Sequence, residues 1–150
     1  EFKFRCSVGK KGVSRSKTEG DLKTPIGIFK LGNIYYRPDR VKKPFSKLKT
    51  LAIKKNMGWC DDPKSKQYNK LIKLPFNFNS EMLYRKDNIY DIIIVLNFNM
   101  KPVVKNKGSA IFIHVAKKNY SPTKGCVALK KFELRKLIEK IKKKTLIKIS

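Results

Sequence analysis

The side chains best suited to covalent chemistry are the only histidine, His114, and a cysteine twelve residues later, Cys126. A thiol becomes a good nucleophile when a base takes its proton, and imidazole is the side chain whose pKa suits that task near neutral pH. Gly125 lets a substrate carbonyl approach the backbone N–H groups of this turn, as oxyanion binding requires. Lys124, next to the cysteine, is expected to lower the pKa of the thiol. The spacing is therefore compatible with a cysteine nucleophile activated by a histidine.

Other interpretations of these residues stay open on spacing alone. Free cysteine is among the residue types most often buried, and a histidine at the end of an apolar strand is commonly a core residue. Three cysteines and one histidine also match the ligands of a structural zinc site, but Cys6, Cys60 and Cys126 lack the short spacing of such sites, so no metal is expected. Because the cysteine count is odd, at least one thiol is free or intermolecular. Asp61 and Asp62, followed by proline, are expected to form a turn.

The elements that must hold these residues are short strands joined by long polar loops. Apolar, β-branched runs at residues 91–96 and 110–115 predict two strands that are covered on both faces, and His114 lies near the end of the second. Alternation of apolar and polar residues at 2–8 and 145–149 predicts half-buried strands. A further short strand is expected within 49–54, and long loops are expected at 9–24, 36–48, 56–68 and 97–107.

The periodicity changes near the C-terminus. Apolar residues at positions 134, 137, 138 and 141 have the i, i+3, i+4, i+7 spacing of an amphipathic helix. Lysines at 142–144 follow its expected end, where cations interact favourably with the helix dipole. The sequence therefore predicts a mainly β fold with one helix near the C-terminus. A length of 150 residues with no linker and no internal repeat indicates a single domain over residues 1–150.

The chain is strongly basic. Lys and Arg number 37 against 11 for Asp and Glu, which gives a formal net charge of +26. A hydrophobic fraction of 41% excludes a disordered polycation, and no apolar stretch approaches the roughly 18 residues of a membrane span. Two interpretations remain open: a solvated lysine surface, or a surface that attracts a polyanion such as nucleic acid or an anionic wall polymer. Because only six of the basic residues are arginine, no specific recognition of nucleic acid is expected.

Several short blocks occur in one order along nearly the whole chain. The blocks GSAIFIH (108–114) and SPTKGCVAL (121–129) look like the catalytic signature of the L,D-transpeptidase catalytic domain family, a histidine followed after a spacer by Ser/Thr-x-Gly-Cys. Further blocks that agree are EGD (19–21), TPIG (24–27), GWCDDP (58–63), YN (68–69), SE (80–81) and YR (84–85). Together the blocks make the chain similar to one bacterial branch of that family.

The resemblance implies a β sandwich or open barrel with an active site in a cleft. It also implies a cysteine acyltransferase in which the thiolate attacks the carbonyl at the L-centre of the third residue of a peptidoglycan tetrapeptide stem and expels D-alanine. A stem amine, a lipoprotein lysine or water then resolves the thioester. By the same resemblance Cys126 is the nucleophile, His114 is the general base and acid, and the backbone N–H groups of Gly125 and Cys126 bind the oxyanion. No cofactor is implied, and the expected location is the bacterial cell envelope, although this chain contains no signal peptide.

Four residues are weaker candidates for substrate binding. Arg85 either receives a stem carboxylate through its planar guanidinium or pairs with a nearby aspartate. Trp59 is either a core or cleft-wall aromatic or a direct contact to the substrate. Thr123 and Ser109 either line the site or cap turns.

The chain departs from the family pattern at three places. Lys124 stands where many relatives carry a second histidine, Ala128 stands where they carry Asn or Arg, and Ser80 lies where this branch often carries a histidine. The alternatives to a transpeptidase are an L,D-carboxypeptidase that uses water as acceptor, and a noncatalytic protein that binds wall polymer or nucleic acid. No feature of the sequence indicates the acyl acceptor or an oligomeric state.

Overall fold

Strands make up most of the regular structure, as the sequence predicts. The structure is a computed structural model that describes residues 1–150. The strands are β1 (Val13–Ser14), β2 (Thr24–Pro25), β3 (Gly27–Tyr36), β4 (Thr50–Ala52), β5 (Met57–Cys60), β6 (Leu71–Lys73), β7 (Ser80–Met82), β8 (Ile92–Leu96), β9 (Phe112–Val115), β10 (Val127–Leu129) and β11 (Leu146–Ile149). One α-helix, α1 (Lys131–Lys140), and a short 3-10 helix, η1 (Lys118–Tyr120), complete the fold. The strands predicted at 49–54, 91–96, 110–115 and 145–149 are confirmed as β4, β8, β9 and β11.

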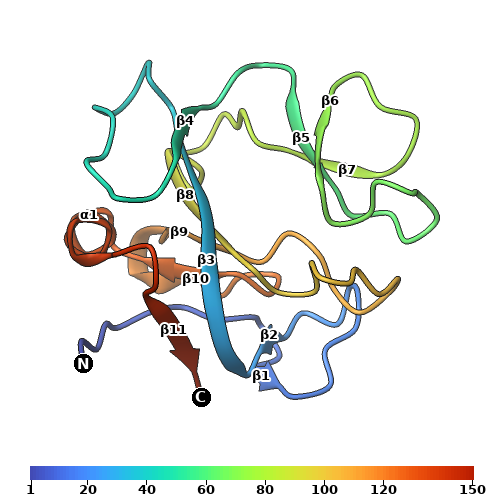
Figure 1. The fold of residues 1–150 in the computed structure, drawn as a ribbon, viewed down its shortest axis with the longest axis horizontal. Helices are drawn as coiled ribbons and strands as arrows, with labels where there is room; N and C mark the ends of the chain where they lie inside the picture. Colours follow the sequence, from blue (N-terminus) through green and yellow to red (C-terminus); the bar gives the residue numbers. More distant parts are fainter.

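The largest sheet has six strands and is built around β3. Its strand order is β10-β9-β8-β3-β11, and β4 also pairs with β3. The first residues of β3, 27–30, pair with β11, and its later residues pair with β8 and β4. The register between β3 and β8 shifts between Leu31 and Ile34. β3 therefore connects two regions of the sheet, with β11 at one end and β4 and β8 at the other (Figure 1).

Each face of this sheet packs against its own hydrophobic cluster. Ile92, Ile94 and Leu96 of β8 belong to the cluster that includes the apolar face of α1. Ile93 and Val95 of the same strand belong to a second cluster on the opposite face. Because both faces are covered, every residue of β8 is buried, and its sequence shows no polar alternation. Full burial of each such side chain contributes about 1.5–3 kcal/mol relative to an exposed one.

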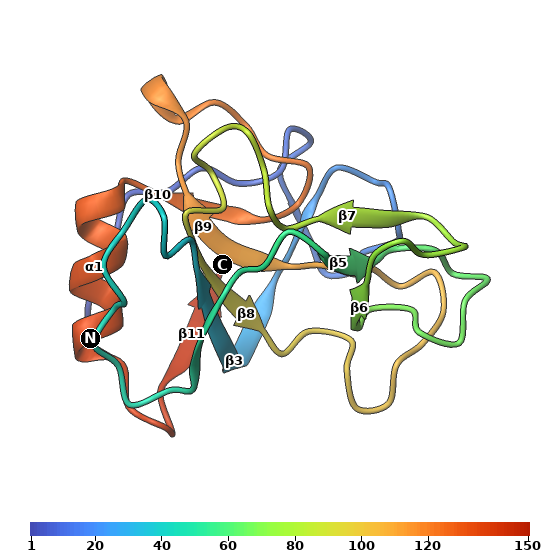
Figure 2. The ribbon, with the colours of Figure 1, turned by 90° about the horizontal axis from the view of Figure 1, so that it is seen from above.

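The predicted amphipathic helix is confirmed. α1 buries Leu134, Leu137 and Ile138, and Ile141 follows as the buried residue that ends the helix. Seen from above, α1 lies at one end of the molecule and the strands β5, β6 and β7 lie at the other (Figure 2). No helix here combines the length and the apolar character that a membrane crossing requires.

Residues 56–68 form more regular structure than the expected loop. β5 occupies the start of this segment and pairs antiparallel with both β6 and β7. Trp59 of β5 is buried and lies edge-on to Phe112 of β9, with ring centroids 5.2 Å apart. A strand forms here because two neighbouring strands supply its hydrogen bonds and the tryptophan anchors it to the main sheet.

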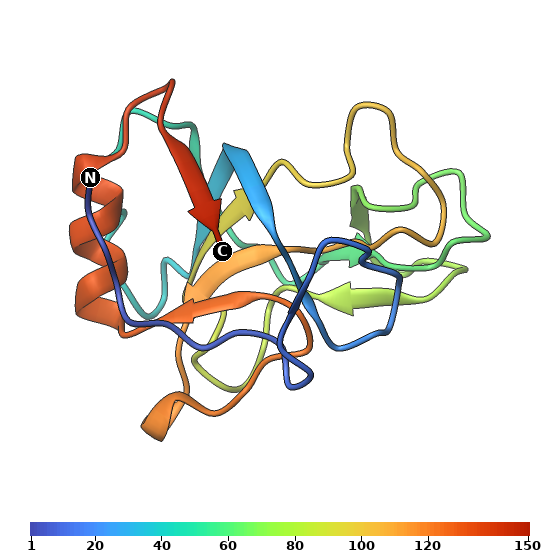
Figure 3. The ribbon, with the colours of Figure 1, turned by 90° about the horizontal axis from the view of Figure 1, so that it is seen from below.

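The N-terminal residues do not form the strand that their alternation predicts. Residues 1–6 make no backbone hydrogen bonds, and Phe2 is 65% exposed. Ser7 and Gly9 form only isolated bridges, to Ala128 and Thr123. A strand needs a neighbour along its length, and this segment reaches one only at Ser7, where it runs beside β10 (Figure 3).

Candidate active site

A cleft of about 540 Å³ opens beside the main sheet. Its walls come from the loop between β1 and β2, from β7 and the loop that follows it, from β9, and from the turn before β10. The lining includes Lys17, Glu81, Arg85, Tyr90, His114 and Cys126. The structure thus brings the predicted nucleophile and the predicted base to one cleft.

The parallel pairing of β9 and β10 explains why Cys126 and His114 meet. In this pair Val127 lies opposite Ile113, and Ala128 lies opposite His114. Cys126 immediately precedes β10 and is therefore level with Phe112. Since side chains alternate along a strand, Phe112 and His114 lie on one face of the sheet, and Cys126 shares that face.

Cys126 is partly buried, and its thiol both donates and accepts a hydrogen bond. Its Sγ donates to the carbonyl oxygen of Ala110 at 3.2 Å and accepts from the backbone N–H of Phe112 at 3.4 Å. Burial, together with the negative charge of Glu81, raises the pKa of the thiol to about 12. The sequence-based expectation that Lys124 lowers this pKa is wrong for the substrate-free protein, because loss of water around the thiolate outweighs the charge of an exposed lysine.

His114 is held as a neutral imidazole. Its Nδ1 lies 2.9 Å from the carbonyl oxygen of Val115. A carbonyl can only accept, so Nδ1 carries the proton and Nε2 is left free to act as a base. The side chain is buried, and burial lowers its pKa to about 4. No hydrogen bond joins His114 to Cys126 in this structure, so the cysteine and histidine are placed in the cleft without being coupled.

The turn at Gly125 is stabilised by a neighbouring hydroxyl. The N–H of Gly125 donates to Thr123 Oγ1 at 3.1 Å, and Thr123 Oγ1 donates to the carbonyl of Cys126 at 2.6 Å. The backbone N–H of Cys126 makes no hydrogen bond within the chain. Of the two N–H groups expected to bind an oxyanion, that of Gly125 is occupied here and that of Cys126 is open.

Arg85 lines the cleft and is already paired. It donates two hydrogen bonds to the carboxylate of Asp87, each 2.8 Å long, and its guanidinium lies over the ring of Tyr90 at 5.2 Å. Asp91 pairs with a different arginine, Arg40, at 3.0 Å. Arg85 therefore pairs with a nearby aspartate, as one of the two sequence-based alternatives proposed, and it also lies in the wall of the cleft.

The other weak candidates lie in different environments. Ser109 lines the cleft and donates a 2.5 Å hydrogen bond to Glu19. Thr123 also lines the cleft, besides capping the turn before Cys126. Trp59 does not line the cleft: it is 5% exposed, donates to Asn69 and belongs to the hydrophobic cluster on that side of the sheet.

Several charged or titratable residues of the cleft were not identified from the sequence. Tyr90 donates a short hydrogen bond to Glu81, and burial raises the pKa of both side chains. Lys17 pairs with Asp21 at the opposite wall. Glu81 and Asp21 do belong to the SE and EGD blocks, but nothing local to those blocks indicates that Glu81 lies beside Cys126 or that Lys17, the partner of Asp21, lines the same cleft. No group of three or more His, Cys, Asp and Glu side chains is placed to hold a metal ion.

The structure is thus a mainly β fold whose cleft is lined by one cysteine and one histidine. Comparison with family models identifies the class of protein: the model of the YkuD family, the L,D-transpeptidase catalytic domain, matches residues 1–149, and the chain belongs to this family. Members of this family are typically cysteine L,D-transpeptidases, and the family acts on the peptidoglycan of the cell wall. No curated protein and no solved structure matches the chain.

Proposed function

We propose that this protein is an L,D-transpeptidase that forms a thioester between Cys126 and a peptidoglycan tetrapeptide stem, and then passes the acyl group to the amine of a second stem. Family membership supports the reaction class. The observation that carries the assignment to this site is the parallel register of β9 and β10, which puts His114 and Cys126 on one face at the cleft.

In the first half of the reaction, His114 Nε2 takes the thiol proton while Sγ attacks the carbonyl carbon at the L-centre of the third stem residue. The C–N bond to the terminal D-alanine then breaks, and the proton on the imidazole passes to the departing amine. The products are a thioester and free D-alanine. Because burial keeps both the thiol and the imidazole neutral at rest, the proton moves during the attack rather than before it.

In the second half, the acceptor amine attacks the thioester carbon and gives up a proton to His114. The C–S bond breaks, the proton returns to Sγ, and a new amide is formed. The open N–H of Cys126 is the backbone donor that we assign to the oxyanion. The N–H of Gly125 can join it only after leaving Thr123 Oγ1.

We also propose that residues 1–150 act as one catalytic domain at the bacterial cell envelope, where peptidoglycan lies. The family match spans residues 1–149, and one sheet contains strands from β3 near the start of the chain to β11 at its end. The net charge of +26 suits contact with an anionic wall polymer.

The test is incubation of the protein, and of its Cys126→Ala and His114→Gln variants, with defined tetrapeptide muropeptides, followed by chromatography and mass spectrometry. We expect cross-linked dimers from the intact protein, none from Cys126→Ala, and a strongly reduced yield from His114→Gln. Tripeptide monomers with free D-alanine and no dimers would instead identify a carboxypeptidase. Unchanged substrate with every variant would contradict an enzymatic role and favour a binding protein.

A further inference from the structure

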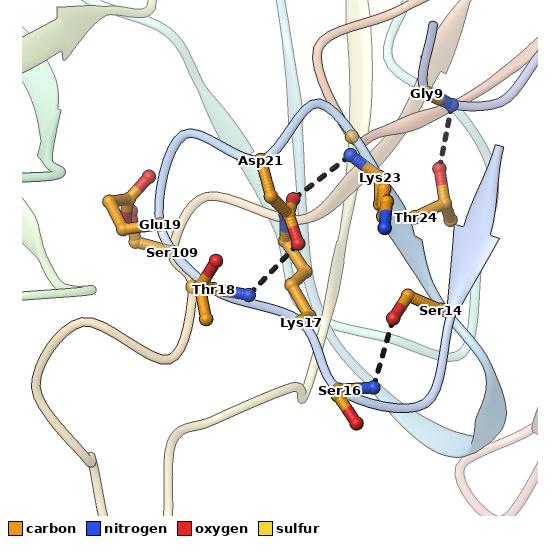
Figure 4. A network of polar contacts seen from close by, with 12 residues as sticks. Gly9, Ser14, Ser16, Lys17, Thr18, Glu19, Asp21, Lys23, Thr24 and Ser109 are labelled. Carbon is orange, nitrogen blue, oxygen red and sulfur yellow. Dashed lines mark hydrogen bonds and ion pairs between the residues drawn. The ribbon is translucent and has the colours of Figure 1, made fainter. Parts of the chain in front are cut away.

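Lys17 is the only buried lysine among the 31 in the chain. It lies in the loop between β1 and β2, and its side chain is 4% exposed. Its Nζ donates one hydrogen bond, of 2.7 Å, to Asp21 and makes no other within the chain. Figure 4 shows Asp21 in this loop, with its bonds to the backbone of Thr18 and Lys23. An ammonium group has three N–H bonds, so two of them have no protein partner at the edge of the cleft.

Two glycines make room for this side chain. A Cβ at Gly108 would lie 3.0 Å from Lys17 Cε, and a Cβ at Gly125 would lie 3.3 Å from Lys17 Nζ. Both glycines have positive φ, +113° and +143°, a conformation that residues with a Cβ rarely adopt. The ammonium group is therefore next to the backbone that leads directly into Cys126.

Asp21 holds the ammonium group in this position. Its carboxylate also accepts hydrogen bonds from the backbone N–H groups of Thr18 and Lys23, each 2.9 Å long. Although burial raises the pKa of Asp21, the bonds from Lys17 and from the two N–H groups lower it overall, so the carboxylate is ionised at neutral pH. The loop thus presents a fixed cation, and the anion that anchors it is occupied by three donors.

The charged and titratable groups that line the cleft with Cys126 come from several elements. Besides Arg85 and Lys124 they are Lys17 and Glu19 in the loop before β2, Asp61 after β5, Glu81 in β7, Tyr90 in the loop before β8, His114 in β9 and Lys117 after β9. Of these, the charges that act on the thiol are those of Glu81 and Lys17. Arg85 also lines the cleft but is paired with Asp87, and Lys124 is exposed to water. Lys17 is therefore the cation best placed to offset the negative charge of Glu81 beside the thiol.

We infer that the Lys17 ammonium, positioned by Asp21, stabilises the negative charge that develops at Cys126, first on the sulfur and then on the oxygen of the tetrahedral intermediate. For the charge on the oxygen, this inference rests on the proposed function. For the charge on the sulfur, it rests on the geometry of the cleft alone. The Lys17 ammonium supplies a second hydrogen-bond donor for the oxyanion, because the N–H of Gly125 is already bonded to Thr123.

The test compares Lys17→Met, which removes the charge, with Lys17→Arg, which keeps it. A control, Lys11→Met, removes one exposed lysine of the same segment. The first readout is alkylation of Cys126, followed by mass spectrometry of its peptide so that Cys6 and Cys60 do not interfere. The charge of Lys17 acts on the thiol to lower its pKa, and a nearby opposite charge shifts a pKa by about 1–3 units, so we expect Lys17→Met to slow alkylation by iodoacetamide about tenfold or more at pH 9. Lys17→Arg and Lys11→Met are expected to react at nearly the wild-type rate.

A second readout separates charge from structure. Relative to the wild type, Lys17→Met should slow alkylation by anionic iodoacetate more than alkylation by neutral iodoacetamide. The reason is that the local cation of the wild type attracts the anionic reagent. Loss of one oxyanion donor typically reduces kcat by about 10²–10³-fold. We expect the kcat of Lys17→Met with muropeptides to fall by an amount approaching this range, with little change in KM. If Lys17→Met does not fold, as judged by near-UV circular dichroism, Lys17→Gln, which also removes the charge, replaces it and should give a decrease in the same direction.

Alkylation rates and a reagent ratio that are the same in folded Lys17→Met and in the wild type would overturn the inference. If the wild type turns over no muropeptide but Lys17→Met still changes the alkylation of Cys126, the proposed transpeptidase function fails while the effect of Lys17 on the thiolate stands. The two proposals are therefore distinguished by one set of proteins.

Discussion

The ring of Tyr90 packs edge-on against the imidazole of His114, with the two ring centroids 5.4 Å apart. The hydroxyl at the other end of the same side chain donates to Glu81. Tyr90 therefore packs its ring against the candidate base, and its hydroxyl is the hydrogen-bond partner of a partly buried carboxylate. Its two ends serve different groups of the cleft, so its contributions can be separated by mutation.

Tyr90→Phe is predicted to keep the ring contact with His114 but to leave Glu81 without its partner. A partly buried carboxylate that loses a hydrogen bond is destabilised, so we expect the free energy of unfolding to fall by about 1–3 kcal/mol. Urea denaturation at neutral pH measures the change. Tyr120→Phe is the matched control, because its hydroxyl also donates to a glutamate, Glu133, but its ring is less buried than that of Tyr90, and a smaller change is expected there. Equal effects of the two substitutions would contradict this account of Glu81.

Burial of His114 predicts that acid destabilises the folded protein. In the unfolded chain this histidine titrates near its ordinary pKa of 6.5, whereas in the folded protein its pKa is lowered to about 4. Between these values the unfolded state binds the proton that the folded state does not. Stability is therefore unaffected above pH 6.5 and decreases as the pH falls toward 4, by up to about 3 kcal/mol from this group.

The measurement for His114 is the difference in unfolding free energy between the wild type and His114→Gln, taken from urea titrations at several pH values. Glutamine does not titrate, so the carboxylates common to both proteins cancel and the difference reports the histidine. We expect the difference to change by about 3 kcal/mol between pH 7 and pH 4. A difference that is constant with pH would mean that the histidine is hydrated in solution.

Gly125→Ala is predicted to strain the turn before Cys126. The added Cβ would lie 3.0 Å from the carbonyl oxygen of Lys23, and φ at this position is +143°. We expect a loss of about 1–3 kcal/mol in stability, together with reduced turnover. Gly12→Ala is the control, since φ there is also positive, +86°, but nothing lies within 4 Å of the new Cβ. If both variants lose the same stability, close approach of the backbone is not the cause at Gly125.

Two arginine ion pairs of different burial should differ in their importance. Arg40 pairs with Asp91, whose side chain is 2% exposed, whereas Arg85 pairs with Asp87, which is 40% exposed. Arg40→Met leaves a buried carboxylate without its cation and is predicted to cost about 3 kcal/mol. Arg85→Met should cost about 1 kcal/mol or less. Thermal or urea denaturation of the two variants checks the order, and a larger loss in Arg85→Met would reverse this interpretation.

The local pattern of apolar residues was enough to predict the strands that are buried on both faces and the helix that is buried on one. β8 and β9 are continuous apolar runs because both faces of the sheet are covered, and α1 shows the stripe of a helix packed on one side. These signals need no knowledge of the partners. The Cys126 and His114 pair was also predicted from the sequence, through their types, their spacing and the matching blocks around them.

Short strands and an unpartnered segment were not predictable in this way. β5, β6 and β7 have three or four residues each, and they exist because they pair with one another. Residues 2–8 have the alternation of a strand, but no neighbouring strand reaches most of them. Pairing partners that are distant along the chain determine such segments, and local sequence carries little information about them.

The chemical state of the cleft was decided by tertiary structure alone. Lys124 is the cation adjacent to Cys126 in the sequence, yet it is exposed, whereas Lys17, more than 100 residues away, is buried against Gly125. Glu81 and Tyr90 meet beside the thiol only because β7 and the loop before β8 fold against β9. Electrostatic interaction depends on distance through space and on the loss of water, so residue types and spacing predicted a nucleophile and a base but not which charged groups would surround them.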